Sequence, residues 1–145
     1  MATTAYTIGF YLSRASRSMR YYVDRLFEDS EFPEVSMGYI GVLLELHRED
    51  DRTISDLSRA VRLEKSTMTG LIERMVRAGL IVREQDENDR RAHRIRLTER
   101  GREVRPLLDR VLSRSYSDLT RGLSNKDIEK TKQVLSRIIE NAAAK

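Results

Sequence analysis

Apolar residues recur at helical spacing over the first third of the chain. Residues 6–29 predict a long helix, ended by Pro33, because apolar side chains fall every three or four positions. These are Ile8, Tyr11, Leu12, Ala15, Met19, Tyr22, Val23 and Leu26. Ser36 is placed to cap a second helix that extends to about His47.

Two shorter helices are predicted next, joined by a tight turn at residues 62–64. Thr53-Ile54-Ser55-Asp56 resembles a capping box with Asp in place of Glu. The helix that it opens has Leu57, Ala60 and Val61 on one side. The following helix is stopped by Gly79 and carries an apolar stripe of Met68, Leu71, Ile72 and Met75. Two short helices joined in this way predict a helix-turn-helix.

After Gly79 the spacing of apolar residues changes from every three or four positions to every second position. Residues 80–85 are β-prone and residues 86–91 form a polar turn. Residues 93–97 alternate, with His93, Ile95 and Leu97 on one face. Two strands around a polar loop predict a hairpin, and a hairpin directly after a helix-turn-helix is a wing.

The helical period returns at Thr98, which is placed to cap a fifth helix reaching about Arg121. Pro106 lies within it and is expected to kink it or remove a hydrogen bond. After Gly122, Ser124-Asn125-Lys126-Asp127 resembles another capping box and opens a sixth helix. The predicted fold class is mainly α: a winged helix-turn-helix with about six helices, long flanking dimerisation helices and a two-stranded wing.

The first, fifth and sixth predicted helices carry more apolar surface than the middle segment can cover. Packing against a second copy would bury it, which predicts a homodimer. Mutual packing of these helices within one chain is the alternative. We therefore expect a helical dimerisation lobe, residues 1–35 and 98–145, and a winged helix-turn-helix lobe for DNA binding, residues 36–97.

Charge is unevenly distributed along the chain. Residues 52–106 contain 14 lysines and arginines against 9 acidic residues, whereas the other residues contain 13 and 14. Excess positive charge in the middle attracts the phosphate backbone of nucleic acid such as double-stranded DNA, and a solvated basic surface explains the same composition equally well. The absence of cysteine excludes disulfides, thiolate zinc sites and thiol redox sensing. With no long apolar run and no signal-peptide pattern, we expect a cytoplasmic protein without a membrane span.

The second helix of the helix-turn-helix is the expected reader of the major groove. Short hydroxyl side chains in its first turn can reach base edges or phosphates, and a glycine lets the backbone approach DNA closely. Ser66 and Thr67 could also serve only as caps. The candidate DNA contacts on this helix are Lys65, Ser66, Thr67, Thr69, Gly70 and Arg74.

The wing tip carries the stronger signal. Arg90 and Arg91 lie where a guanidinium can enter the narrow, electronegative minor groove. Asp89 is spaced to pair with Arg91 and fix its direction. A solvated polar turn is the other interpretation, but the position directly after a helix-turn-helix favours DNA contact.

The wing and its flanks resemble a known family. Asp89-Arg90-Arg91, Ile95-Arg96-Leu97-Thr98 and Gly101 are similar to the signature of MarR-type regulators, especially the SlyA-like branch. Residues 54–58, Ser66-Thr67 and residues 78–81 also match that pattern. Ser58 departs from it, where the family usually has Ala, and Pro106 is less usual within the fifth helix.

The resemblance implies a triangular dimer formed by helices one, five and six, and pseudo-palindromic DNA sites. It implies recognition helices in major grooves and wing arginines in minor grooves. It further implies a regulator, most often a repressor, and many such proteins release DNA on binding a phenolic ligand.

The first predicted helix holds a candidate site for such a small phenolic or aromatic acid effector. An arginine can hold a carboxylate while aromatic and thioether side chains cover a ring. Interchain or surface salt bridges are the other interpretation of these arginines. The candidate ligand-binding residues are Tyr11, Arg14, Arg17, Tyr21, Met37 and Tyr39.

Two other functional classes remain open on the sequence alone: a winged helix used only for protein contact, and a small-molecule enzyme. Neither His47 nor His93 has a nucleophile constellation near it in sequence. We therefore expect no catalytic residue, no cofactor and no metal. Steep salt dependence of duplex DNA binding would separate a DNA-binding regulator from both alternatives.

Overall fold

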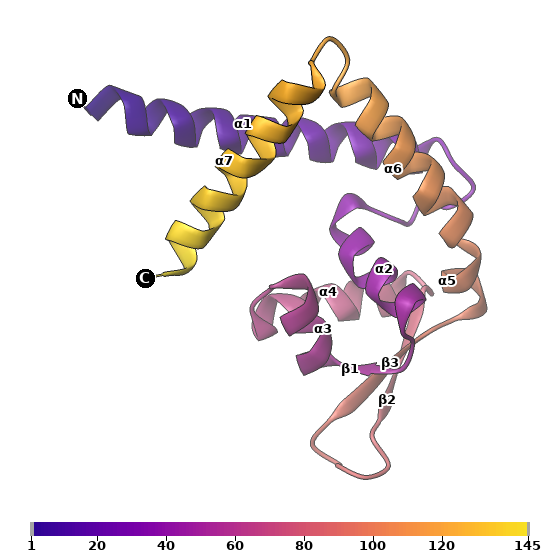
Figure 1. Ribbon diagram of the computed structural model, residues 1–145. Helices are drawn as coiled ribbons and strands as arrows, with labels where there is room; N and C mark the ends of the chain where they lie inside the picture. The colour runs from indigo at the N-terminus through magenta and orange to yellow at the C-terminus, as the bar shows by residue number, and fades with distance from the viewer. Residues whose placement is uncertain (1, 145) are drawn as a thin grey trace. The chain divides into compact units, whose positions relative to one another are not determined.

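The computed structural model describes residues 2–144, and of residues 2–6 it describes the backbone alone. Figure 1 shows the order of elements, which begins with α1 (Ala2–Glu28), the 3₁₀ helix η1 (Met37–Tyr39), α2 (Ile40–Arg48), β1 (Arg52–Thr53), α3 (Ile54–Val61) and α4 (Lys65–Arg77). It continues with β2 (Ile81–Gln85), β3 (His93–Leu97), α5 (Glu99–Glu103), α6 (Arg105–Leu119) and α7 (Asn125–Ala143). The predicted mainly α, winged helix-turn-helix fold is confirmed.

The chain packs as two units, one up to Leu112 and the other from Ser113 onward. The core of the first unit takes buried side chains from α1, α2, α3, α4 and α6, and from β2 and β3. Its fully buried members include Phe27, Leu43, Leu46, Leu57, Met68, Ile72, Met75, Leu80, Ile95 and Leu108. The four apolar side chains predicted on one face of α4 are all buried.

The inner face of α3 differs from its prediction by one residue. Ala60 is exposed, and Ser58 is buried in its place. Ile54, Leu57, Ser58 and Val61 follow the i, i+3, i+4, i+7 rule of one helical face, and Ala60 falls outside it. A polar side chain therefore lies in an otherwise apolar position.

The connection from α1 to α2 also differs from the prediction. Helix α1 ends at Glu28, before Pro33, in a turn where the Ser30 hydroxyl donates to the Phe27 carbonyl at 2.6 Å. The Ser36 side chain makes no cap hydrogen bond. Instead the Met37 N–H donates to Oδ1 of Asp24, at 2.6 Å, so the predicted local cap is replaced by a carboxylate from α1.

The helix-turn-helix follows the predicted turn chemistry. The Thr53 hydroxyl accepts a hydrogen bond from the Asp56 N–H at 3.1 Å, which caps α3. Arg62 adopts a left-handed conformation, with φ of 54°, and directs the chain into α4. Gly79, with φ of 72°, ends the turn after α4 as predicted.

The wing is part of an antiparallel sheet with the strand order β1-β3-β2. Strands β2 and β3 form the predicted hairpin, in which Arg83 pairs with Ile95 and Gln85 with His93. The third strand, β1, was not predicted because two residues are too few to show a period. It pairs Arg52 with Ile95 and thereby ties the wing to the start of α3.

The predicted fifth helix is two helices, α5 and α6, separated at Val104. Thr98 caps α5 as predicted, accepting from the Gly101 N–H at 3.0 Å. Pro106 is the second residue of α6, and it has no N–H to donate to the Arg102 carbonyl. The proline therefore starts a new helix rather than kinking a continuous one. At Gly101 a Cβ would lie 2.0 Å from the Leu80 carbonyl oxygen, so only glycine fits.

In the second unit, α7 begins with a complete capping box, in which Ser124 and Asp127 exchange side-chain and backbone hydrogen bonds. Gly122, with φ of 82°, lies in the turn before it. No residue of α7 is buried, and Val134 and Ile139 are about half exposed. Within residues 2–144, no helix is both long and apolar enough to cross a membrane.

Candidate DNA interface

The outer face of α4 takes no part in packing the core. Its apolar side is buried, so Lys65, Ser66 and Thr67 lie exposed at its start. The cap residue of α4 is Glu64, which makes no side-chain cap bond, so Ser66 and Thr67 are not its cap. The Thr69 hydroxyl donates to the Lys65 carbonyl at 2.9 Å. These side chains are available to a partner.

Gly70 and Arg74 lie on the same helix, beyond the first turn. A Cβ on Gly70 would meet only the Arg74 guanidinium, at 3.6 Å. The fold therefore has room for a side chain at position 70, and glycine is not needed for internal packing. A bare backbone at this point is what close approach of a partner requires.

The tip of the wing is shaped by its own side chains. Oδ1 of Asp86 accepts from the N–H groups of Asn88 and Asp89, at 2.8 and 3.2 Å. The Gln85 side chain donates to the Arg90 carbonyl at 2.7 Å. These bonds fix the loop while leaving the side chain of Arg90 exposed.

Asp89 and Arg91 form the ion pair that their spacing predicted. Nε of Arg91 lies 3.7 Å from Oδ1 of Asp89, and the Arg91 N–H donates to the same oxygen at 3.0 Å. The Arg91 side chain is nevertheless 96% exposed. Asp89 therefore directs a guanidinium that remains open to a partner.

A hollow of about 200 Å³ connects the start of α4 with the base of the wing. It brings together three of the predicted DNA contacts, Lys65, Thr69 and Arg91. Its other polar members were not among the predicted contacts; they are Thr53, Ser55, Arg83 and His93. Nη2 of Arg83 lies 3.3 Å from Nδ1 of His93. Only the register of the hairpin places these two side chains together, and that register is not readable from periodicity.

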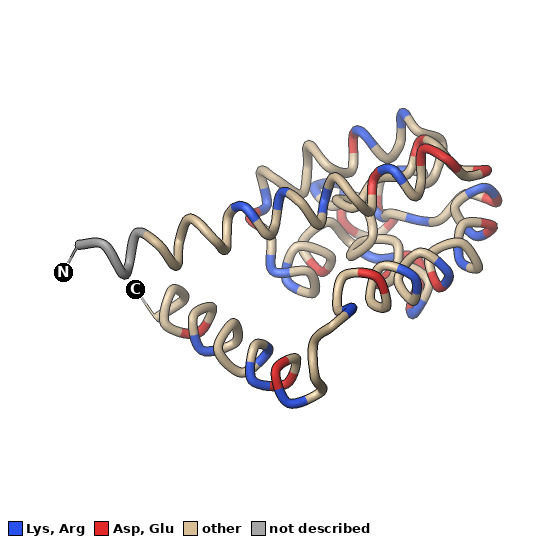
Figure 2. The backbone as a smooth tube through the Cα atoms, turned by 90° about the horizontal axis from the view of Figure 1, so that it is seen from above, with Lys and Arg blue, Asp and Glu red and all other residues tan. Residues whose placement is uncertain are grey.

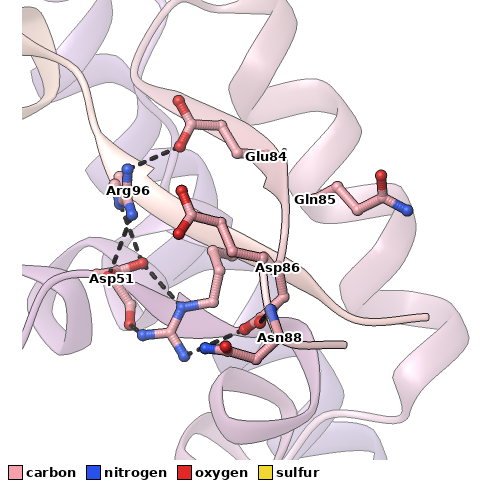
Figure 3. A pocket seen from close by; sticks show the side chains of 8 residues that line it. Asp51, Glu84, Gln85, Asp86, Asn88 and Arg96 are labelled. Atoms are coloured by element: carbon pink, nitrogen blue, oxygen red, sulfur yellow. Dashed lines mark hydrogen bonds and ion pairs between the residues drawn. The ribbon is translucent and has the colours of Figure 1, made fainter. Parts of the chain in front are cut away.

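Two other wing arginines hold the wing to the loop before β1. Asp51 adopts a left-handed conformation, with φ of 62°, and its Oδ1 pairs with Nε of Arg94 at 2.9 Å and Nε of Arg96 at 3.0 Å. Figure 3 shows Arg96 reaching both Asp51 and Glu84, the latter at 2.7 Å. We call Asp51, Glu84, Asp86, Arg94 and Arg96 the wing clasp. Hydrogen bonds from Arg94 and Arg96 lower the pKa of Asp51 to about 2.

Several cations of α4 and the wing have no ion pair among the described residues, a property they share with arginines of α1 and with Arg62 and Arg77. Basic and acidic positions are interspersed along the backbone (Figure 2), so location in the sequence does not mark the interface. Arg52, Arg59, Arg94, Arg96, Arg100, Arg102 and Arg110 all have carboxylate partners. Among the described residues, no carboxylate lies within ion-pair distance of Lys65, Arg74, Arg83 or Arg90. Unpaired cations on α4 and the wing suit a polyanionic partner.

The predicted effector residues lie in two places. Tyr11 and Tyr21 on α1 are 64% and 67% exposed, and Arg14 and Arg17 are also exposed. Met37 and Tyr39 are partly buried against the core in η1. Arg20 is the α1 arginine beside η1, since its Nη1 would lie 3.5 Å from a Cβ on Gly38. Tyr11 is nine residues before Arg20, about 14 Å along the helix axis.

The described residues contain no group of side chains that could bind a metal ion. Across residues 2–144, no three His, Cys, Asp or Glu side chains are grouped so that they could hold an ion. Burial and the nearby Arg105 lower the pKa of His47, which favours its neutral form. The arrangement of α3, α4 and the wing, with unpaired cations facing outward, defines a winged helix-turn-helix DNA-binding protein.

Comparisons with known proteins show similarity to one family of regulators. The model of the MarR family matches residues 35–93. A MarR transcriptional regulator from Methanosarcina mazei Go1 is 27% identical, with 95% of this chain and 97% of that chain covered and a TM-score of 0.75. The chain is thus similar to the MarR family of transcription regulators, whose members are DNA-binding proteins and not enzymes. The closer similarity to the SlyA-like branch stays a prediction.

Two more distant structures share the fold. Reduced AbfR, solved bound to DNA, is 21% identical, with 97% of this chain and 92% of that chain covered and a TM-score of 0.77. The organohalide-sensing regulator RdhR, solved with 2,4-dichlorophenol, is 17% identical, with 94% and 80% covered and a TM-score of 0.86. The fold of this chain therefore occurs in one protein seen on DNA and in another seen with a small aromatic ligand.

Proposed function

We propose that this protein is a transcriptional repressor that binds pseudo-palindromic operators as a homodimer and is released by a small aromatic acid. The observation that carries the DNA-binding part is the set of unpaired, exposed cations shared by α4 and the wing. In this proposal Lys65, Ser66, Thr67, Thr69, Gly70 and Arg74 enter the major groove, and Asp89 holds Arg91 toward the minor groove with Arg90 beside it.

The homodimer is supported by large apolar side chains that lie exposed in the described part of the chain. On α1, Ile8 is 52% exposed and Phe10 46%, and on α7, Ile139 is 56% exposed. A second copy would cover such residues without any change of fold, because a twofold interface pairs the same surface of two identical chains. Residues 1–35 and 98–145 are the proposed dimerisation lobe, and residues 36–97 the proposed DNA-binding lobe.

The effector part of the proposal uses the exposed flank of α1. Arg14 and Arg17 would bind a carboxylate, while Tyr11, Tyr21, Met37 and Tyr39 would cover an aromatic ring. Because Tyr11 and Arg14 are exposed, the second copy must complete the site. The ligand must favour one spacing of the two α4 helices, since equal affinity for both states shifts nothing.

Selection of bound sequences from a random duplex pool by the purified protein tests the DNA-binding part. We expect an enriched inverted repeat, and affinity for it that falls steeply with salt. Recovery of unselected sequence, or affinity independent of salt, would reject DNA recognition in favour of a winged helix that contacts only proteins.

Titration of salicylate-like acids into the complex with the selected DNA tests the effector part. A typical coupling of about 1–3 kcal/mol weakens DNA binding roughly 5- to 150-fold. Arg17→Ala should abolish this response, whereas Arg48→Ala on α2 should keep it, because Arg48 already pairs with Glu45. Equal responses of the two variants would place the ligand elsewhere.

A further inference from the structure

The hollow between α3, α4 and the wing has the chemistry of an anion site. Its lining includes Lys65, Arg83 and Arg91 and contains no carboxylate among the described residues. The hydroxyl of Thr69 is already bonded to the helix backbone, and that of Thr53 to Asp56. The exposed hydroxyl of Ser55 has no such bond in the part of the chain described. The hollow therefore offers positive charge and one open hydroxyl, and its described lining has no carboxylate, although Asp56 and Asp89 bind the lining residues Thr53 and Arg91.

Arg83 and His93 contact each other at this hollow, and an anion would be a stronger hydrogen-bond acceptor for Arg83 than the imidazole is. A guanidinium has only donors, so the Nδ1 atom 3.3 Å from Nη2 of Arg83 must act as the acceptor. The ring can do so only while Nδ1 is unprotonated. An anionic oxygen is a stronger acceptor for the guanidinium, and it would leave the imidazole free to bind a proton and donate.

We propose that this hollow binds one phosphodiester group of the DNA backbone through Arg83, and that His93 takes up a proton as the phosphate enters. The proposal rests on the proposed DNA binding and adds a backbone contact to the groove contacts above. The charged groups around His93 are Arg83 on β2, Arg91 in the wing loop and Lys65 on α4, with Asp89 paired to Arg91 and Asp56 of α3 bonded to Thr53. A phosphate in the hollow would add a negative charge to this set.

The salt dependence of DNA binding measures the phosphate contact. Neutralising one contact should lower the slope of log affinity against log salt by about 0.9. We therefore expect Arg83→Gln to reduce the salt slope by about one unit. It should also lower the affinity for the selected duplex and for random duplexes by the same factor. Lys126→Gln, which removes an exposed cation from the start of α7, should keep the wild-type slope.

A backbone substitution in the DNA identifies the partner group. Single phosphates of the selected duplex are replaced by neutral methylphosphonates. At one position the loss of charge should weaken DNA binding by the wild type but not by Arg83→Gln. Such non-additivity is the mark of two groups in direct contact. Losses that add at every position would overturn the phosphate assignment.

The pH dependence of affinity tests the role of His93. Between pH 8 and pH 6 wild-type affinity should rise relative to His93→Gln, by no more than about tenfold per pH unit for one proton. Parallel curves for the two proteins would overturn the proton uptake. If His93→Gln does not fold, the same comparison is made with Arg83→Gln, which removes the phosphate partner.

The outcomes separate this proposal from the proposed function. If the wild type binds no duplex, the proposed function itself fails. If the wild type binds and Arg83→Gln keeps the full slope, only the phosphate site fails. If Arg83→Gln alters sequence preference and leaves the slope unchanged, Arg83 contacts bases, and the phosphate assignment is equally overturned.

Discussion

The backbone nitrogen of Met37 lies 2.6 Å from Oδ1 of Asp24, so a side chain of α1 caps the helical segment that leads into α2. Asp24→Ala removes this acceptor and should lower the free energy of unfolding by about 1–2 kcal/mol, the range of a lost cap. Urea denaturation measures the change. Asp29→Ala is the matched control, since Asp29 is an exposed acid at the end of α1, and it should lose no stability. Equal losses in both variants would contradict a capping role.

Ser58 should be replaceable with a gain in stability. Its Oγ atom is buried and has no hydrogen-bond partner among the described residues. Ser58→Ala removes an unsatisfied hydroxyl from the inner face of α3, so we expect the free energy of unfolding to rise by about 1 kcal/mol. Ser117→Ala, at an exposed position of α6, should stay close to the wild type. A destabilised Ser58→Ala protein would show that the hydroxyl is satisfied.

Arg91→Ala should weaken DNA binding without unfolding the protein. The Arg91 side chain is 96% exposed, so no core packing depends on it. We expect a loss of roughly 1–3 kcal/mol in binding free energy, the scale of one well-made groove contact. A titration with the selected duplex at fixed salt measures it, and the thermal melting curve should be unchanged. Affinity equal to that of Arg48→Ala would exclude the wing tip from the interface.

A homodimer with one α4 in each half-site makes affinity depend on half-site spacing. The half-site centres should be about 10 base pairs apart, one turn of the duplex. Inserting five base pairs between them turns one half-site to the opposite face and should abolish tight binding. A gel-shift titration compares the two duplexes. A monomer by light scattering at micromolar concentration, or equal affinity for both duplexes, would contradict the dimer.

The wing clasp should make stability depend on pH in the acid range. The pKa of Asp51 is lowered from 3.8 to about 2, so its ionised carboxylate stabilises the fold above about pH 4. This contribution is lost as the pH falls from about 4 toward 2. Asp51→Asn, which also tolerates the left-handed backbone, should be less stable than the wild type at pH 6. The difference should shrink as the pH falls through this window.

Urea denaturation at successive pH values measures this difference. Asp109→Asn serves as the control, because Asp109 pairs with Arg105 on the surface of a single helix and such pairs contribute little. A difference between Asp51→Asn and the wild type that is constant from pH 6 down to pH 3 would show that charge is not its source.

The sequence predicts the elements whose causes are local. The apolar stripe of α4, the left-handed Gly79 and the Thr98 cap are each decided by side chains within one or two turns, and all three are confirmed. The Asp89–Arg91 pair was predictable for the same reason, because two residues of one turn form it.

What the sequence could not predict depends on contacts between distant segments. The Asp24 cap joins positions 13 residues apart, and the bonds from Arg94 to Asp51 join positions 43 apart. Arg83 could be recognised as a basic residue of a strand, but its meeting with His93 requires the hairpin register. The helix break at Val104 was predicted only in part. Pro106 indicates a disruption, but the sequence does not tell whether the helix bends or a new helix starts.

The loop of the wing is shaped by few side chains, and this bears on how binding preferences change during evolution. Asp86 accepts from the N–H groups of residues 88 and 89, and Gln85 donates to the carbonyl of residue 90, so the bond at position 90 uses only a backbone carbonyl that every amino acid has. Glu87 and Arg90 can therefore be exchanged without disturbing these bonds. Related regulators could acquire new operators by substitution at these two positions while the rest of the protein is inherited unchanged.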